Sequence, residues 1–457
     1  MEATAQLATL VAGSRLDSLP EAAIAIVKDR ILDTVGVSLA GTVQDSGRIA
    51  SAYVREHGGA PDAGVIGGGF RVPTEAAALA NGVLAHAHLY EDDGTDLIGH
   101  PSSPLVSAIL PVAEWRGSSG LDIIRAYILG FEVEVKLGRA VNPTMYDHGW
   151  HNTGIIGAVG ATAAVAHLLR LSTDELHMAF GIVASLASGI RQNFGTMTMA
   201  LHVGNAARNG VMAVLLARRG FNADPLALEG PLGFANLFAG SGKHDLGKLL
   251  SHWTDPLEVI SPGSTLKFYP AGGPTNTGID AVLDIVKHET IRPEDVAEIV
   301  WAGPKRWVDK TVFRTDPQRA IEGKTSLLFC LAVALVDREV TLRQFTDEKI
   351  RDPRIRAVME KVRAVSHPDL AEDVFLFGSE VTIRMRDGRE FRRLVRIRKG
   401  HPDNPLTPEE LLSKYRHCAD LILTPTARDR SVELLQRLDA LDAAGVRELA
   451  RVICRLP

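Results

Sequence analysis

Histidines and carboxylates crowd into one short segment of the chain. Residues 86–96 hold two histidines, one tyrosine and four carboxylates, among them Asp92 and Asp93, and His100 follows soon after. Crowded carboxylates repel one another, so some of them need a cation, a metal ion or a proton. Histidine also exchanges protons near neutral pH, which makes the segment a candidate for acid–base catalysis. A solvated acidic loop is the alternative; a metal site is less well matched, because no HExxH or paired spacing occurs.

A second polar cluster separates two strongly apolar stretches and contains Tyr146 and His151. His151 stands directly before a predicted helix, where backbone N–H groups point outward. That position suits an anion or a catalytic imidazole. A capping loop with a hydrogen-bonded histidine is the alternative.

Two further clusters carry cations. Arg191, Gln192 and His202 lie in a glycine-broken connection between predicted helices, and the Arg191 guanidinium suits a carboxylate. Lys267 stands where the sequence pattern changes, and a lysine at a domain boundary is well placed to meet a substrate. An ordinary helix–helix loop and a solvated linker lysine are the alternatives. The sequence has no GxxxxGK[ST], no GxGxxG after a strand and no GxSxG, which argues against phosphate-loop, dinucleotide-binding and serine-hydrolase sites.

Apolar residues at helical spacing predict helices through most of the first 260 residues. The predicted helices cover residues 22–39, 74–90, 104–115, 121–141, 153–171, 172–190 and 201–220. Few stretches alternate with period two, so this part is predicted to be an all-helical domain. The most apolar stretch, residues 153–169, is rich in glycine and alanine and contains His167, which favours a core helix over a membrane span.

The pattern changes at residues 261–264, Ser-Pro-Gly-Ser. Beyond them, helices are predicted at residues 277–288, 320–336 and 347–362, and strands at 296–301, 380–385 and 390–397. Asp387-Gly388 between the last two alternating runs is typical of a hairpin.

We therefore expect a mainly α protein with two domains. Residues 1–265 together with 405–457 are predicted to form the large all-helical domain, and residues 266–404 a smaller α+β lid domain. The lid is expected to have two covalent connections, at residues 261–264 and 402–405.

Composition excludes several classes of function. Of the 457 residues, 46% are hydrophobic and 23% charged, as in globular rather than disordered proteins. A net charge of −5 and 5% aromatic residues argue against a nucleic-acid partner. Three dispersed cysteines, Cys330, Cys418 and Cys454, form no disulfide framework, and residues 1–6 do not begin a signal peptide. We expect a cytoplasmic protein without a membrane partner.

The clusters, in this order, resemble the MmgE/PrpD family over almost the whole chain. The marks are Ile31-Leu-Asp-Thr-Val-Gly36, the acidic segment up to His100-Pro-Ser, Gly149-Trp-His151, Leu201-His-Val-Gly-Asn-Ala-Ala207 and Lys267-Phe-Tyr-Pro270. The resemblance implies a large helical domain with an α+β lid, a homodimer, an active site between the domains, and no metal or organic cofactor. It puts His100, His151 and Lys267 on functional positions, with Asp92 or Asp93 corresponding to the family's aspartate.

Departures from the family pattern bear on the reaction. The family includes enzymes that dehydrate 2-methylcitrate, decarboxylate cis-aconitate and epimerise iminodisuccinate. Members of the first two kinds typically have a lysine in Thr-Lys-Pro-Leu-His, where this chain has Met199, and many have Cys and His where it has Gly272 and Asn276. Inversion needs only removal of a proton on one face and its return on the other. The loss of a cationic side chain is therefore easier to reconcile with epimerisation than with dehydration.

We therefore expect an epimerase that inverts a carbon next to a carboxylate in a polycarboxylate such as iminodisuccinate. In this hypothesis Tyr146 and His151 transfer the proton on opposite faces, and Lys267 and Arg191 bind carboxylates and stabilise the enolate. His100, oriented by Asp92 or Asp93, completes the pocket, with Gln192 and His202 as further substrate-binding residues. A 2-methylcitrate-type dehydratase and an inactive polycarboxylate-binding protein are the alternatives.

Overall fold

The computed structural model describes residues 2–94, 96–305, 307–308, 314–370 and 378–456, and these divide into two compact units. The first unit comprises Met1–Ala87, Glu91–Ser264 and Pro408–Pro457, and the second comprises His88–Tyr90 and Thr265–Thr407. The chain therefore passes from one unit to the other four times, after Ala87, Tyr90, Ser264 and Thr407. The sequence predicted only two such connections.

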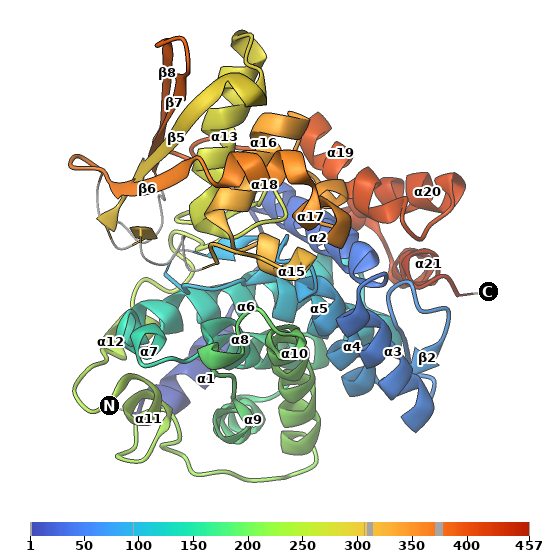
Figure 1. Cartoon of the computed structure of the whole chain (residues 1–457). Helices are drawn as coiled ribbons and strands as arrows, with labels where there is room; N and C mark the ends of the chain where they lie inside the picture. The colour runs from blue at the N-terminus through green and yellow to red at the C-terminus, as the bar shows by residue number, and fades with distance from the viewer. Residues whose placement is uncertain (1, 95, 306, 309–313, 371–377, 457) are drawn as a thin grey trace. The chain divides into compact units, whose positions relative to one another are not determined.

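The first unit is built almost entirely from helices, as Figure 1 shows. The longer ones are α1 (Ala3–Gly13), α2 (Glu21–Gly41), α3 (Asp45–His57), α4 (Thr74–His86), α5 (Ser102–Arg116), α6 (Gly120–Val141), α8 (Asn152–Leu169), α9 (Thr173–Leu186), α10 (Met197–Ala217), α19 (Pro408–Ala419), α20 (Pro425–Gln436) and α21 (Ala443–Ile453). The prediction of a mainly α protein is confirmed. The unit is not wholly helical, however, because β1 (Ala63–Gly64) and β2 (Arg71–Val72) form an antiparallel pair around a glycine-rich turn.

Helix α8 lies at the centre of the first unit and packs against α5, α6, α9 and α10 (Figure 1). It is the one helix among the described residues long and apolar enough to cross a membrane, yet 89% of that window is buried inside the protein. Its many glycines and alanines let neighbouring helices approach closely; Gly160 leaves room for the side chain of Glu134 on α6. The helix therefore belongs to the core.

The second unit combines a sheet with helices. Strands β5 (Val296–Gly303), β6 (Val362–Ser366), β7 (Ser379–Met385) and β8 (Glu390–Val395) lie in the order β6-β5-β7-β8, with β5 and β6 parallel and the other pairs antiparallel. Helices α13 (Gly273–His288) and α16 (Leu327–Asp337) supply much of its apolar core.

Several predicted helices differ from the observed ones, and three of them show how. Helix α4 stops at His86 rather than continuing to residue 90, because the chain turns at Leu89, whose φ is 54°. The helix predicted over residues 320–336 is divided into α15 (Ala320–Gly323) and α16. The helix predicted over residues 347–362 is divided into α17 (Asp347–Arg351) and α18 (Pro353–Met359), and Val362 already begins β6.

Candidate active site

Four histidines of the first unit lie at helix ends that meet in its interior. His86 is the last residue of α4, and His100 lies just before α5. His151 directly precedes α8, and His202 lies in the second turn of α10. The ring centroid of His86 lies 5.1 Å from that of His100 and 5.6 Å from that of His151. The ring centroids of His151 and His202 are 5.2 Å apart. The four imidazoles therefore form a continuous row.

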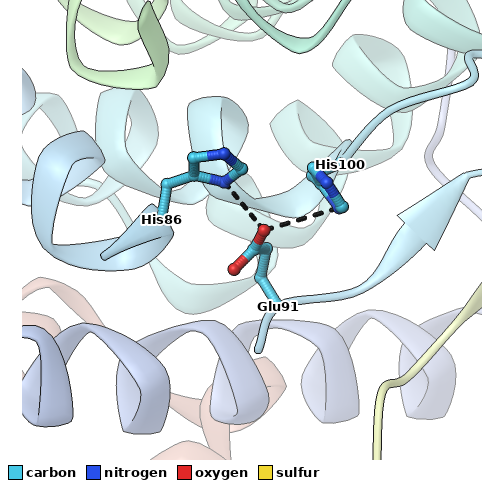
Figure 2. Close-up of side chains that lie close together, drawn as sticks. All are labelled: His86, Glu91 and His100. Atoms are coloured by element: carbon cyan, nitrogen blue, oxygen red, sulfur yellow. Dashed lines mark ion pairs between the residues drawn. The ribbon is translucent and has the colours of Figure 1, made fainter. Parts of the chain in front are cut away.

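Glu91 joins the row at His86 and His100. Its Oε1 lies 2.7 Å from His86 Nδ1 and 3.4 Å from His100 Nδ1, and both rings face the carboxylate in Figure 2. His86 and Glu91 are fully buried, so each needs the other as a polar partner. The sequence placed both residues in the acidic segment but assigned neither a role, because nothing local indicates which members of such a segment face inward.

The same three residues could hold a divalent metal ion. Their ligand atoms all lie within 4.8 Å of one another, and imidazole nitrogen with carboxylate oxygen is a donor set that zinc accepts. The donor set is also what proton transfer requires, so the geometry alone is compatible with both uses. The expected absence of a metal remains a prediction.

His100 is held in one orientation by its own segment. Its Nδ1 lies 2.8 Å from the carbonyl oxygen of Asp92 and 3.0 Å from Oδ1 of Asp93. Because a carbonyl oxygen can only accept, Nδ1 carries a proton, and Nε2 is the ring nitrogen left to exchange a proton with another group.

Asp92 and Asp93 differ in what their carboxylates do. The Asp92 carboxylate accepts hydrogen bonds from the backbone N–H and the hydroxyl of Ser102, at 3.2 and 2.7 Å, at the start of α5. Of the two aspartates left open by the sequence, only Asp93 brings a carboxylate to the His100 ring. Asp92 contributes its carbonyl oxygen.

His151 and His202 share a buried hydrogen bond between their Nδ1 atoms, which lie 3.0 Å apart. The backbone N–H of His151 donates to the carbonyl of Gly189 at 3.0 Å, and this fixes the residue before α8. The Phe194 ring lies nearly perpendicular to the His151 ring, with centroids 4.9 Å apart. His151 is thus enclosed by aromatic and imidazole rings.

This enclosure disfavours a charged imidazolium. Burial, with the neighbouring His86, His202 and His100, holds the pKa of His151 well below its ordinary value, although Glu91 opposes the shift. Burial and His86 lower the pKa of His202 to about 4. Both rings are therefore neutral at pH 7 and can accept protons or donate through N–H.

Tyr146 and Arg191 lie against each other. The guanidinium carbon of Arg191 lies 3.8 Å from the Tyr146 ring centroid, and Nη1 donates to the Tyr146 carbonyl at 2.8 Å. Gln192, on the same short turn, is exposed. Met199 is buried at the start of α10 and supplies no charge. The roles of Tyr146, Arg191 and Gln192 stay predictions.

In the second unit, two buried lysines hold the segment His88–Tyr90. Lys267 Nζ donates to the Leu89 carbonyl at 3.0 Å, and Lys324 Nζ lies 2.9 Å from the His88 carbonyl and 2.8 Å from its Nδ1. The sequence pointed to Lys267 but missed Lys324, which lies inside a predicted helix. The break in that helix, at Gly323-Lys-Thr-Ser326, was the available signal.

Comparisons with known proteins add a family context. The model of the MmgE/PrpD N-terminal domain matches residues 5–246, and that of the MmgE/PrpD C-terminal domain matches residues 269–440. The chain is 27% identical to cis-aconitate decarboxylase of Mus musculus, over 97% of this chain and 92% of that protein. It is 27% identical to cis-aconitate decarboxylase of Aspergillus terreus, over 86% and 84%. It is 23% identical to 2-methylcitrate dehydratase of Escherichia coli (strain K12), over 65% and 64%.

Proposed function

The chain belongs to the MmgE/PrpD family, and from this premise we propose that it is a cofactor-independent epimerase of a polycarboxylate such as iminodisuccinate. The observation that carries the proposal is the row of four imidazoles, three of them buried, with the buried carboxylate of Glu91. Such a set of groups can take up and release protons. The named activities of the relatives support a polycarboxylate as the class of substrate.

The proposed chemistry begins at the hydrogen on the carbon next to a carboxylate. His151 and Tyr146 remove and return this proton on opposite faces, and His100, through its Nε2, completes the acid–base set. Arg191 lies on the Tyr146 ring and holds this residue in place through its carbonyl oxygen. Lys267 and Arg191 bind carboxylates and stabilise the enolate, and Gln192 and His202 line the pocket.

Met199 favours inversion over elimination. A buried thioether neither pairs with a carboxylate nor donates a proton to a leaving hydroxyl. Inversion has no leaving group, so it needs no such donor. The substitution is thus more easily accommodated by an epimerase than by a dehydratase.

A second candidate is a lyase of the 2-methylcitrate dehydratase type. The relatives favour it, because those compared are named decarboxylases and dehydratases. In that case another cation takes the place of the missing lysine.

Proton NMR in D2O tests the two candidates together. The protein is incubated separately with iminodisuccinate stereoisomers, 2-methylcitrate and cis-aconitate. Loss of the methine signal with interconversion of the iminodisuccinate isomers is expected. A vinylic-methyl singlet from 2-methylcitrate, in place of its methyl doublet, or conversion of cis-aconitate, without isomer interconversion, would move the assignment to the lyase. No change in any of the three compounds would leave a binding protein.

A further inference from the structure

The hydrogen bond between His151 and His202 constrains both rings at once. A neutral imidazole carries one proton, on Nδ1 or on Nε2. Since the two Nδ1 atoms lie 3.0 Å apart and face each other, one must hold the shared proton and the other must accept it. The ring that donates therefore has a bare Nε2, and the ring that accepts has Nε2–H.

We propose that His151 and His202 form a proton relay, in which His202 is the positioning residue that takes the Nδ1 proton of His151. The inference rests on the proposed function, because it assumes that His151 is one of the groups that removes the substrate proton. It changes the role of His202 from substrate binding to action through His151.

The relay moves one proton onto the histidine pair and one proton within it. At the start His151 holds the shared proton on Nδ1, so its Nε2 is bare and His202 carries Nε2–H. The substrate C–H bond breaks, its proton goes to His151 Nε2, and its electron pair stays on the substrate as the enolate. The Nδ1 proton moves to His202 Nδ1. His151 is then a neutral ring with Nε2–H, and the positive charge rests on His202.

This route places the charge where it costs less. His151 touches Phe194 and lies between His86 and His202, so a cation there is poorly solvated and repelled. The charged and titratable groups that surround His151 are His86, His100, His202 and Glu91. His202 lies at the end of the histidine row and has one imidazole ring against it, that of His151, whereas His151 has two, so a cation on His202 meets less repulsion. For inversion, the proton is then returned by Tyr146 on the opposite face, and in the reverse direction the relay runs backwards so that His151 Nε2 donates.

The backbone around the pair is shaped to hold it. Gly189 has a φ of 140°, and a Cβ on it would lie 3.2 Å from His202 Cγ and 3.3 Å from Nδ1. Gly154, in the first turn of α8, also lies close to His202, since a Cβ there would lie 3.1 Å from His202 Cβ. Both glycines allow the rings to meet, and a side chain at either position would push His202 away.

The first test uses the full chain without substrate, labelled with 15N-histidine. We expect a downfield proton resonance from the N–H···N bridge in the wild-type protein. It should vanish in His202→Ala and persist in His148→Ala, a control at an exposed histidine. Absence of the bridging proton in the wild-type protein would overturn the relay whatever the activity.

The second test measures exchange of the substrate hydrogen in D2O. His202→Ala should lower kcat by about 10²-fold, a typical loss for a missing acid–base partner, and leave KM within about twofold. Added imidazole should restore part of kcat, which a merely structural role for His202 would not allow. Wild-type kcat in His202→Ala, or a loss that imidazole never restores, would contradict the relay. A wild-type protein that shows the bridge but transforms none of the polycarboxylates would instead contradict the proposed function.

Discussion

Asp92 and Asp93 are chain neighbours with different contacts, and this difference predicts different phenotypes. The Asp93 carboxylate lies 3.0 Å from His100 Nδ1. Asp93→Asn removes the negative charge that orients the ring, so we expect activity to fall by about 10- to 100-fold with little change in the thermal midpoint. Steady-state kinetics and thermal unfolding measure the two quantities.

Asp92→Asn is the matched comparison. The Asp92 carboxylate binds the N–H and hydroxyl of Ser102, whose hydroxyl also lies 2.6 Å from that of Tyr127. Loss of the Asp92 carboxylate should lower the free energy of unfolding by about 1–2 kcal/mol, as loss of a helix cap does. The hydrogen bond between His100 Nδ1 and the Asp92 carbonyl oxygen is unaffected by the substitution. Equal losses of stability in both variants would contradict this division of roles.

Glu132, buried in α6, makes stability depend on pH. Burial, with the nearby charge of Glu258, raises the pKa of Glu132 to about 7, against the hydrogen bond from the Glu258 N–H and the charge of Lys136. The folded state thus holds this proton more tightly than the unfolded state. The stability that protonation contributes is fully present below pH 4.5 and is lost as pH rises from 4.5 to about 7.

Glu132→Gln removes this titration and keeps an oxygen for the Glu258 N–H. We expect urea unfolding to show a flatter pH profile from pH 4.5 to 7 and a gain of about 2 kcal/mol at pH 8. Glu56→Gln, at an exposed position in α3, is the control. Parallel profiles for Glu132→Gln and the wild-type protein would count against the interpretation.

At the scale of elements, the contact between α4 and α10 brings His86 and His202 into one row. The two helices meet at glycines: a Cβ on Gly204 would lie 2.5 Å from the Leu79 carbonyl oxygen, and one on Gly82 would lie 2.7 Å from Gly204 Cα. Such distances are possible only without side chains.

Gly204→Ala should therefore separate α4 from α10. We expect the free energy of unfolding to fall by about 2 kcal/mol or more, with a loss of activity because His86 and His202 move apart. Gly13→Ala, at the end of α1 where an added Cβ meets nothing within 4 Å, is the control and should be neutral or slightly stabilising. Chemical denaturation and exchange kinetics check both; a Gly204→Ala protein as stable as Gly13→Ala would refute the packing argument.

Periodicity predicted the existence of most helices, but not their ends. Apolar spacing marks the buried face of α2, α5, α6 and α8, and these helices lie within two residues of the predicted bounds. The β6 strand was missed because Val362 follows α18 without a Gly or Pro signal, so the apolar pattern of the helix runs into that of the strand.

At the scale of the molecule, the homodimer expected from the family remains a prediction. Leu232, Leu237 and Phe221 are 83%, 62% and 57% exposed. Large apolar side chains exposed in one stretch of chain are typical of a surface that binds another protein chain. We expect light scattering to give twice the chain mass of 49.2 kDa.

Leu232→Glu combined with Leu237→Glu should shift the protein towards the monomer if this stretch forms the interface. Ile49→Glu, at a residue 60% exposed on α3, provides the control. A wild-type protein that scatters as a monomer would exclude the dimer. A dimer that tolerates the double change would place its interface elsewhere.

The sequence by itself determined which residue types are available for chemistry and which segments become helices, because both depend on local order along the chain. It indicated His100, His151 and His202 from separate clusters. Only the tertiary structure decided that these three lie in one row with His86, beside Glu91, that Asp93 rather than Asp92 brings its carboxylate to His100, and that His151 and His202 share a hydrogen bond. The reason is physical: helix periodicity fixes which side of a helix is buried, whereas the meeting of helix ends depends on how closely distant helices pack and on the residue at which each one stops.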